Sequence, residues 1–167
     1  MYYRFCSALL LGGCVVSKTK QRINPYSNGE EDQMLGDKVY ETSGKVTARR
    51  VLPNPGGGPK VEISIETNGN LLGIETTETA TYWSAVRPDG SLFGEGQGIL
   101  IGKGGEMATW VAQGVGTMKQ DGATSFRGAV YYQSSSRDWS RLNSVAVVYE
   151  YEADARGSTR AEAWEWK

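Results

Sequence analysis

The chain contains no histidine, and its only two cysteines, Cys6 and Cys14, lie near its start. Without histidine there is no Ser-His-Asp triad, no imidazole-ligated haem and no histidine general base. Residues 34–167 contain no thiol, which excludes a cysteine nucleophile, a disulfide and a thiolate zinc site there. The carboxylates show no spacing of the EF-hand type. We therefore expect neither a metal site nor a cofactor.

The net charge is also close to zero, and the chain has no long hydrophobic run. Eighteen Lys and Arg residues against nineteen Asp and Glu residues give a net charge of −1. The basic residues are scattered, so nothing in the charge pattern favours binding to nucleic acid or to an anionic membrane. The apolar stretch at residues 5–16 is too short to span a bilayer. We predict no transmembrane segment and no nucleic-acid partner.

Residues 1–33 differ from the rest of the chain. A polar stretch rich in helix and strand breakers occupies residues 24–32, and strand-like patterning begins at Met34. We interpret residues 1–33 as a leader outside the fold, either disordered or upstream of a true start near Met34, and expect a cytoplasmic protein. Leu11-Gly-Gly-Cys14 loosely resembles a bacterial lipobox, so a lipoprotein anchored through Cys14 is one alternative. An ordered N-terminal element is the other.

Glycine is abundant, at 22 residues, and Trp and Tyr are frequent, a composition typical of strands and tight turns. The dipeptide Asn68-Gly69 is the strongest hairpin signal, and residues 88–90, 120–122 and 155–157 fit three-residue loops that end in glycine. Residues 102–106 fit a glycine-rich loop of five residues. Eight segments have a strand pattern: 38–52, 60–67, 70–86, 91–101, 107–118, 123–133, 144–154 and 158–167. Short turns make consecutive strands antiparallel neighbours, and closure removes the exposed edges. Residues 34–167 are therefore predicted to form one all-β domain, a closed antiparallel up-and-down barrel of about eight strands.

The turns also set the register of four central strands. In that register aromatic residues lie opposite glycines or one another, in the pairs Tyr82–Gly96, Gly98–Trp110, Trp110–Tyr132 and Gly116–Phe126. A ring over a cross-strand glycine uses the space that the missing Cβ leaves. The face that carries these pairs is free of charge in these strands, so we assign it to the interior. A one-residue bulge near residues 76–78 would invert the assignment and bury a polar set instead, formed by Glu95, Gln97, Gln113 and Arg127.

The inward-facing rings are the candidate ligand-binding residues: Tyr82, Trp110, Phe126 and Tyr132. They either line a cavity or fill an ordinary packed core, and the facing glycines favour the cavity. Glu78 projects toward the same face in this register and joins the candidate set. Near tyrosines it could act as an acid or a base, whereas a carboxylate at a strand break or at the barrel mouth is the plainer interpretation. No catalytic residue can be assigned.

The segment 134–143 is the longest connection and has room for a helical turn. Its four serines have no histidine partner, so a hydrolase is not expected. We expect this segment to cover the barrel mouth with Trp139 packed inward. In the last strand, Trp164 and Trp166 are expected to help seal the barrel.

Several stretches after Leu72 carry a family resemblance: GIETTETATYWS, LFGEGQGIL, EMATWVAQGVG, SFRGAVYYQ and AEAWEWK. In strand pattern and in the mixture of glycine and aromatic residues, they resemble the bacterial branch of the allene-oxide-cyclase-like barrels, which are related in shape to plant allene oxide cyclases and dirigent proteins. The resemblance implies an eight-stranded antiparallel barrel with a hydrophobic lumen. Active members guide the cyclisation of a bound, flexible substrate, and some bacterial relatives are spirotetronate-type cyclases. No family catalytic residue matches a position here.

Three functions remain open. The leading hypothesis is a barrel that binds a small hydrophobic molecule in its lumen, either as a binding protein or as a cyclase or isomerase that confines its substrate. The second is a non-catalytic carrier of the lipocalin type. The third is a closed-core barrel that acts as an interaction or structural protein through its outer wall. Glu95, Gln97, Gln113 and Arg127 would then form an interface with a partner or with a second subunit, so a homo-oligomer is left open.

Overall fold

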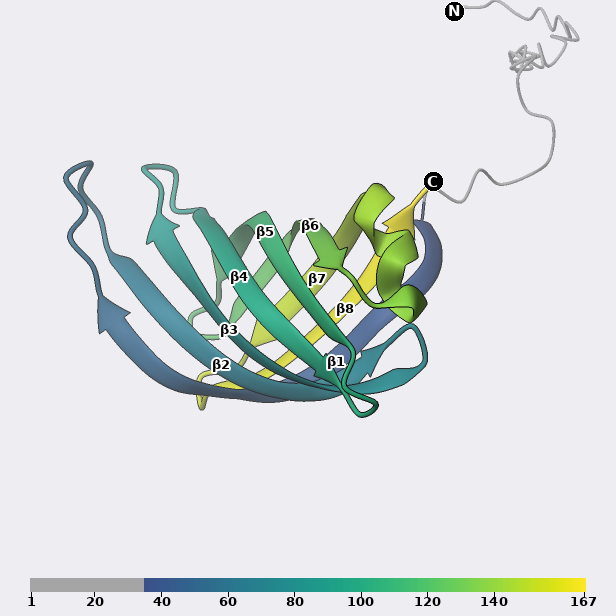
Figure 1. The fold of residues 1–167 in the computed structure, drawn as a ribbon. Helices are drawn as coiled ribbons and strands as arrows, with labels where there is room; N and C mark the ends of the chain where they lie inside the picture. Colours follow the sequence, from purple (N-terminus) through teal and green to yellow (C-terminus); the bar gives the residue numbers. More distant parts are fainter. Residues whose placement is uncertain (1–34) are drawn as a thin grey trace, which may run out of the picture. The chain divides into compact units, whose positions relative to one another are not determined.

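Eight strands follow one another around a closed antiparallel barrel, in chain order, and β1 pairs with β8 to complete it (Figure 1). This computed structural model describes residues 35–167. The strands are β1 (Leu35–Val51), β2 (Lys60–Leu71), β3 (Ile74–Val86), β4 (Leu92–Gly102), β5 (Met107–Met118), β6 (Thr124–Ser134), β7 (Val147–Ala153) and β8 (Ser158–Trp166). The predicted fold class is confirmed. The predicted leader, with Cys14, lies outside the described residues.

Three of the predicted loops form as expected. Each is closed by a backbone hydrogen bond between flanking residues, namely Arg87 N to Ser91 O at 2.8 Å, Lys119 N to Ala123 O at 2.8 Å and Asp154 N to Ser158 O at 2.9 Å. The last residue of each loop has a positive φ, which glycine adopts without strain; these residues are Gly90, Gly122 and Gly157. These loops keep consecutive strands in short antiparallel hairpins.

The predicted hairpin at Asn68-Gly69 is wrong. The chain turns instead at Leu72-Gly73, where both residues have positive φ, and the Asn70 side chain accepts a hydrogen bond of 2.7 Å from the Gly73 amide. Gly69 is needed within β2, because a Cβ there would lie 2.1 Å from the Glu41 carbonyl oxygen of β1. The glycine that signalled a turn thus serves the close approach of two strands.

The central register is the predicted one. Tyr82 pairs with Gly96, Gly98 with Trp110 and Trp110 with Tyr132, and Gly116 pairs with Phe126. The pairing of β3 with β2 and β4 is continuous across residues 76–78, so the bulge that would invert the two faces is absent there. The polar set lies on the outer wall, where Gln113 donates to Glu95 at 2.9 Å and Arg127 pairs with Glu150 at 2.7 Å.

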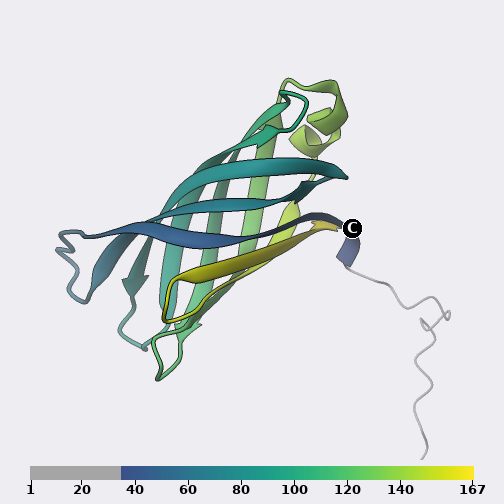
Figure 2. The ribbon, with the colours of Figure 1, turned by 90° about the horizontal axis from the view of Figure 1, so that it is seen from below.

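One end of the barrel is plugged by η1 (Arg137–Ser144), a 3₁₀ helix between β6 and β7. As predicted, Trp139 is fully buried, and Leu142 is buried beside it. The Trp139 indole donates to the Leu71 carbonyl at 3.2 Å. Figures 1 and 2 place η1 at the end where β8 finishes, and an ion pair of 3.0 Å between Arg141 and Glu165 joins the two elements.

The last strand does not seal the barrel with its tryptophans. Along β8 the buried positions are Thr159 and Ala163, so the alternating Trp164 and Trp166 lie on the outer side, and Trp166 is 60% exposed. Small residues on the inner face of β8 leave space in the lumen instead. Among residues 35–167, the helical segment is too short to cross a membrane.

Candidate functional site

A cavity of about 90 Å³ lies inside the barrel. It draws its lining from two hydrophobic clusters, one that includes the η1 plug with Tyr40 and Tyr132, and one built around Ile63, Ile65 and Ala80. All five residues predicted from the sequence line this single cavity: Glu78, Tyr82, Trp110, Phe126 and Tyr132. That they bind a ligand remains a prediction.

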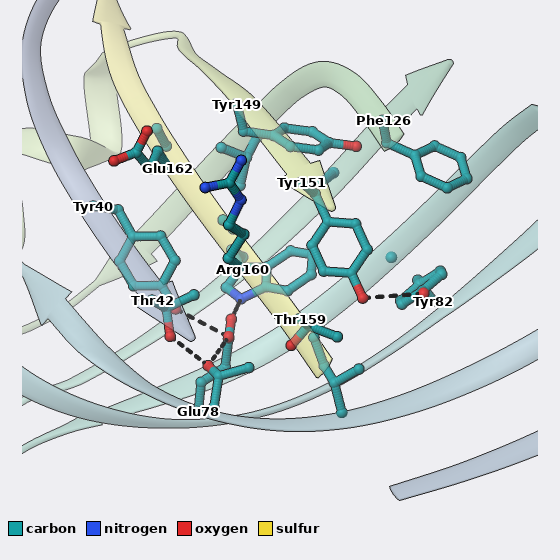
Figure 3. Close-up of a pocket in the computed structure, with 18 of the residues that line it drawn as sticks. Tyr40, Thr42, Glu78, Tyr82, Phe126, Tyr149, Tyr151, Thr159, Arg160 and Glu162 are labelled. Atoms are coloured by element: carbon teal, nitrogen blue, oxygen red, sulfur yellow. Dashed lines mark hydrogen bonds between the residues drawn. The ribbon is translucent and has the colours of Figure 1, made fainter. Parts of the chain in front are cut away.

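Glu78 is the polar centre of the cavity. Its side chain is buried, at 6% exposure, and three neutral donors converge on it. Tyr40 Oη and Thr67 Oγ1 donate to Oε2 at 3.0 and 2.6 Å, and the Trp110 indole donates to Oε1 at 2.7 Å (Figure 3). Thr42 extends the network with a 2.7 Å bond between its hydroxyl and that of Thr67. These bonds hold the carboxylate at a fixed place in an otherwise apolar lumen.

The register explains how the Trp110 indole reaches Glu78. The two residues lie on β5 and β3, with β4 between them, and Gly98 of β4 pairs with both Ala80 and Trp110. A Cβ at Gly98 would lie 2.6 Å from the indole nitrogen of Trp110. Because glycine has no side chain there, the indole lies flat across β4 and its N–H arrives at the carboxylate.

A second group of rings lies beyond Glu78 along β3, formed by Tyr82, Phe126 and Tyr151. Their ring centroids are 5.5 to 6.4 Å apart in tilted or edge-to-face contacts, and the Tyr82 and Tyr151 hydroxyls lie 3.1 Å apart. Phe126 is buried, whereas the two tyrosines are only partly buried. The lumen is therefore plugged at the η1 end and less completely covered at the end of this cluster.

The tyrosines of the lumen are held in their neutral form. Burial raises the pKa of Tyr149 to about 12. Burial, and after it the charge of Glu78, raises the pKa of Tyr40 far above its ordinary value, and burial raises the pKa of Tyr132 and Tyr151 as well. These hydroxyls therefore act at neutral pH as hydrogen-bond donors and acceptors, not as anions.

One polar atom of the lining lacks a partner. Within residues 35–167, the buried hydroxyls of Thr76 and Thr159 make no hydrogen bond, and Thr159 belongs to the cavity lining. Buried polar groups are nearly always satisfied, so an unpaired hydroxyl at a cavity is a place where a ligand or water can bond. No group of three potential metal-ligating side chains gathers in this part of the chain.

Sequence reasoning missed six hydroxyl-bearing members of the site: Tyr40, Thr42, Thr67, Tyr149, Tyr151 and Thr159. Tyr151 and Tyr149 alternate with charged or aliphatic residues in the segment 144–154, and that pattern could have identified them as inward-facing. Tyr40 and Thr67 had no such signal. Their place opposite Glu78 depends on how β1 and β2 pair, and no correctly predicted turn set that register.

The comparisons with known proteins concern the fold. No protein-family profile and no curated protein matches the chain. Three solved structures resemble this barrel, and in each case the alignment covers nearly all of the neighbouring chain. A β-barrel-like protein from Acinetobacter baumannii AYE has a TM-score of 0.68 and 14% identity, covering 78% of this chain and 94% of that one.

A protein of unknown function from Clostridium acetobutylicum ATCC 824 has a TM-score of 0.69 and 12% identity, over 78% of this chain and 95% of that one. A conserved protein of unknown function from Rhodopseudomonas palustris has a TM-score of 0.66 and 12% identity, over 77% and 95%. At such identities the likeness shows the barrel fold alone. The resemblance to allene-oxide-cyclase-like barrels stays a prediction.

Proposed function

We propose that this barrel binds a small, largely hydrophobic molecule in its lumen, with Glu78 holding the polar end of that molecule. The observation that carries the proposal is the cavity itself, which has aromatic walls and one buried carboxylate fixed by three donors. A protein that needed only a packed core would have little reason to bury a carboxylate beside an unfilled space. The cavity thus argues against the closed-core alternative.

The volume limits the ligand. An engineered cavity of about 150 Å³ accepts benzene, so a space of about 90 Å³ accepts a smaller group. At no more than about 1.5 kcal/mol per heavy atom, a ligand of roughly five heavy atoms would reach at best a low-micromolar Kd. Either the natural ligand is that small, or a larger molecule inserts one end past the partly exposed Tyr82 and Tyr151.

Catalysis at this site would take the form of a cyclase or isomerase. A carboxylate in a water-poor lumen can move a proton on a substrate that the walls hold in one shape. The resemblance to allene-oxide-cyclase-like barrels agrees with that chemistry. A carrier would use the same site without turnover, and only a substrate assay separates these two forms of the proposal.

Saturation-transfer NMR tests the binding. Small neutral probes, 2-propanol and 2-butanone, are titrated against the parent chain, Trp110→Ala and Gln113→Ala. Trp110 lines the cavity, whereas Gln113 is exposed on the same strand. We expect saturable binding that changes with Trp110→Ala and is unaffected by Gln113→Ala. An absence of saturable binding, or a loss confined to Gln113→Ala, contradicts the proposal.

A further inference from the structure

Building on the lumen site proposed above, we infer that its occupant is a small organic cation. It is a protonated alkylamine, whose ammonium group lies against the Glu78 carboxylate and whose carbons lie among the aromatic rings. The inference goes beyond apolar binding, because it assigns a charge to the ligand.

The first argument is the missing countercharge. Within residues 35–167 every ion pair joins side chains other than Glu78, so no lysine or arginine pairs with this carboxylate. Tyr40, Thr67 and Trp110 solvate the carboxylate with neutral bonds only. A buried charge without an opposite partner is unfavourable, and a cationic ligand would remove that penalty on binding.

The second argument is unused acceptor capacity. A carboxylate offers about four lone-pair positions over its two oxygens. Oε2 of Glu78 accepts from two hydroxyls, but Oε1 accepts only from the Trp110 indole, so one position on Oε1 is free for an N–H of the ligand. The unpaired hydroxyl of Thr159 in the same lining can accept a second one, because an ammonium group carries up to three donors.

The third argument is the nature of the walls. Seven aromatic side chains line the cavity, and six of them are Tyr or Trp, whose ring faces attract cations. The six come from five strands around the same cavity: Tyr40, Tyr82, Trp110, Tyr132, Tyr149 and Tyr151. A neutral ligand would gain from burial alone, whereas an ammonium gains from burial, from the ring faces and from the carboxylate.

The other charged residues near the cavity do not oppose a cationic ligand. The lining also includes Glu95, Arg160 and Glu162, but their side chains lie on the outer side of the barrel: Glu95 accepts from Gln113 at 2.9 Å, and Glu162 pairs with Lys38 at 3.0 Å, which leaves Glu78 as the carboxylate of the lumen. The single base, Arg160, has a side chain that is 74% exposed and is paired with Glu152 at 2.8 Å, which neutralises it on the outside of the barrel. The charge of Arg49 tends to lower the pKa of the Tyr82 and Tyr151 hydroxyls, which lie beyond Glu78. Because Arg49 is exposed, water and salt screen its repulsion of a cation in the lumen.

Two probes of equal size test the inference: isopropylammonium and 2-propanol, which have nearly the same shape and differ in charge at pH 7. Their dissociation constants are measured from the shift of the Trp110 indole N–H resonance, assigned with Trp110→Phe. The variants are Glu78→Gln, which removes the lumen charge while keeping an acceptor, and Glu66→Gln. Glu66 is exposed and adjacent to Thr67 on β2, so Glu66→Gln removes the same charge from the outer wall.

We expect isopropylammonium to bind the parent chain at least about tenfold more tightly than 2-propanol. The preference should disappear or reverse in Glu78→Gln, because an ammonium is the better hydrated of the two probes, and it should persist in Glu66→Gln. Equal affinities in the parent chain overturn the cation inference alone and leave the lumen site standing. If neither probe binds, the lumen site falls as well. The comparison in the parent chain decides even if Glu78→Gln does not fold.

Discussion

Gly98→Val tests the packing on which both the barrel wall and the site depend. A Cβ built at Gly98 lies 2.6 Å from two ring atoms of Trp110 and 2.8 Å from Ala80 Cβ, and neither neighbour is the free end of a flexible chain. Overpacking of this kind costs about 1–3 kcal/mol. Replacing a glycine inside a strand also stabilises the fold by about 0.5–1 kcal/mol, because the unfolded chain becomes less flexible. We therefore expect a net fall of about 1–2 kcal/mol in the free energy of unfolding.

For a domain of this size that loss lowers the melting temperature by roughly 4–8 °C. The measurement is a thermal melt followed by circular dichroism, with Gln97→Val as the matched control. Gln97 precedes Gly98 on β4 but is exposed, so valine there should stay within about 0.5 kcal/mol of the parent. If Gly98→Val melts with the parent while Gln97→Val does not, the assignment of the inner face is refuted.

Three further predictions follow from burial. Trp139→Ala, which removes the fully buried plug, should cost about 3–5 kcal/mol in urea unfolding, whereas Trp166→Ala at an exposed position should cost about 0.5 or less; equal losses would contradict the plug. The raised pKa of Tyr149, about 12 against the ordinary 10, means that its contribution to stability is complete below pH 10 and is lost as pH rises through 12. Urea unfolding at pH 8, 10 and 11.5 should show the decline, and Tyr149→Phe should make it shallower without removing it, because the pKa values of Tyr40, Tyr132 and Tyr151 are raised as well; an unchanged slope would refute the assignment. A chain that starts at Met34 should melt within a few degrees of the full chain, because β1 to β8 close the barrel within residues 35–167, and a fall of more than about 10 °C would show that residues 1–33 are structural.

The part of the barrel that sequence reasoning predicted is the part with readable turns. The loops at 88–90, 102–106 and 120–122 each fix one strand against the next, and the register of β3 to β6 follows from them. All five predicted lining residues lie on these strands, and the cross-strand pairs directly set the positions of four of them: Tyr82, Trp110, Phe126 and Tyr132. Glu78 joins them because β3 is unbroken.

The part that could not be predicted depends on β1. This strand is the longest, pairs with β2 and β8, and shifts register between Val46 and Ala48 and again before Tyr40. The chain between β1 and β2 is a longer connection, residues 52–59; its glycine turn is closed by a bond of 2.9 Å from Gly57 N to Asn54 O but is not one of the short hairpin loops from which the register was predicted. No turn at all joins β8 to β1. The contact between Tyr40 and Glu78 therefore depends on barrel closure, a long-range event that local patterns do not encode. The misread Asn68-Gly69 signal has the same origin, since Gly69 is set by its approach to β1.

The glycines of β4 connect folding to the proposed function. At Gly96 a Cβ would lie 2.8 Å from Tyr82 Cβ, and at Gly98 it would meet the Trp110 indole. The inner face of this stretch therefore has no side chains of its own and is covered by rings from β3 and β5. Rings that lie against the wall leave the centre of the barrel open. They also turn the indole N–H toward Glu78, which supplies one of the three bonds that hold the carboxylate. The pattern of alternating glycines that first marked an inner face is thus the physical reason that the lumen has both a space and a fixed charge beside it.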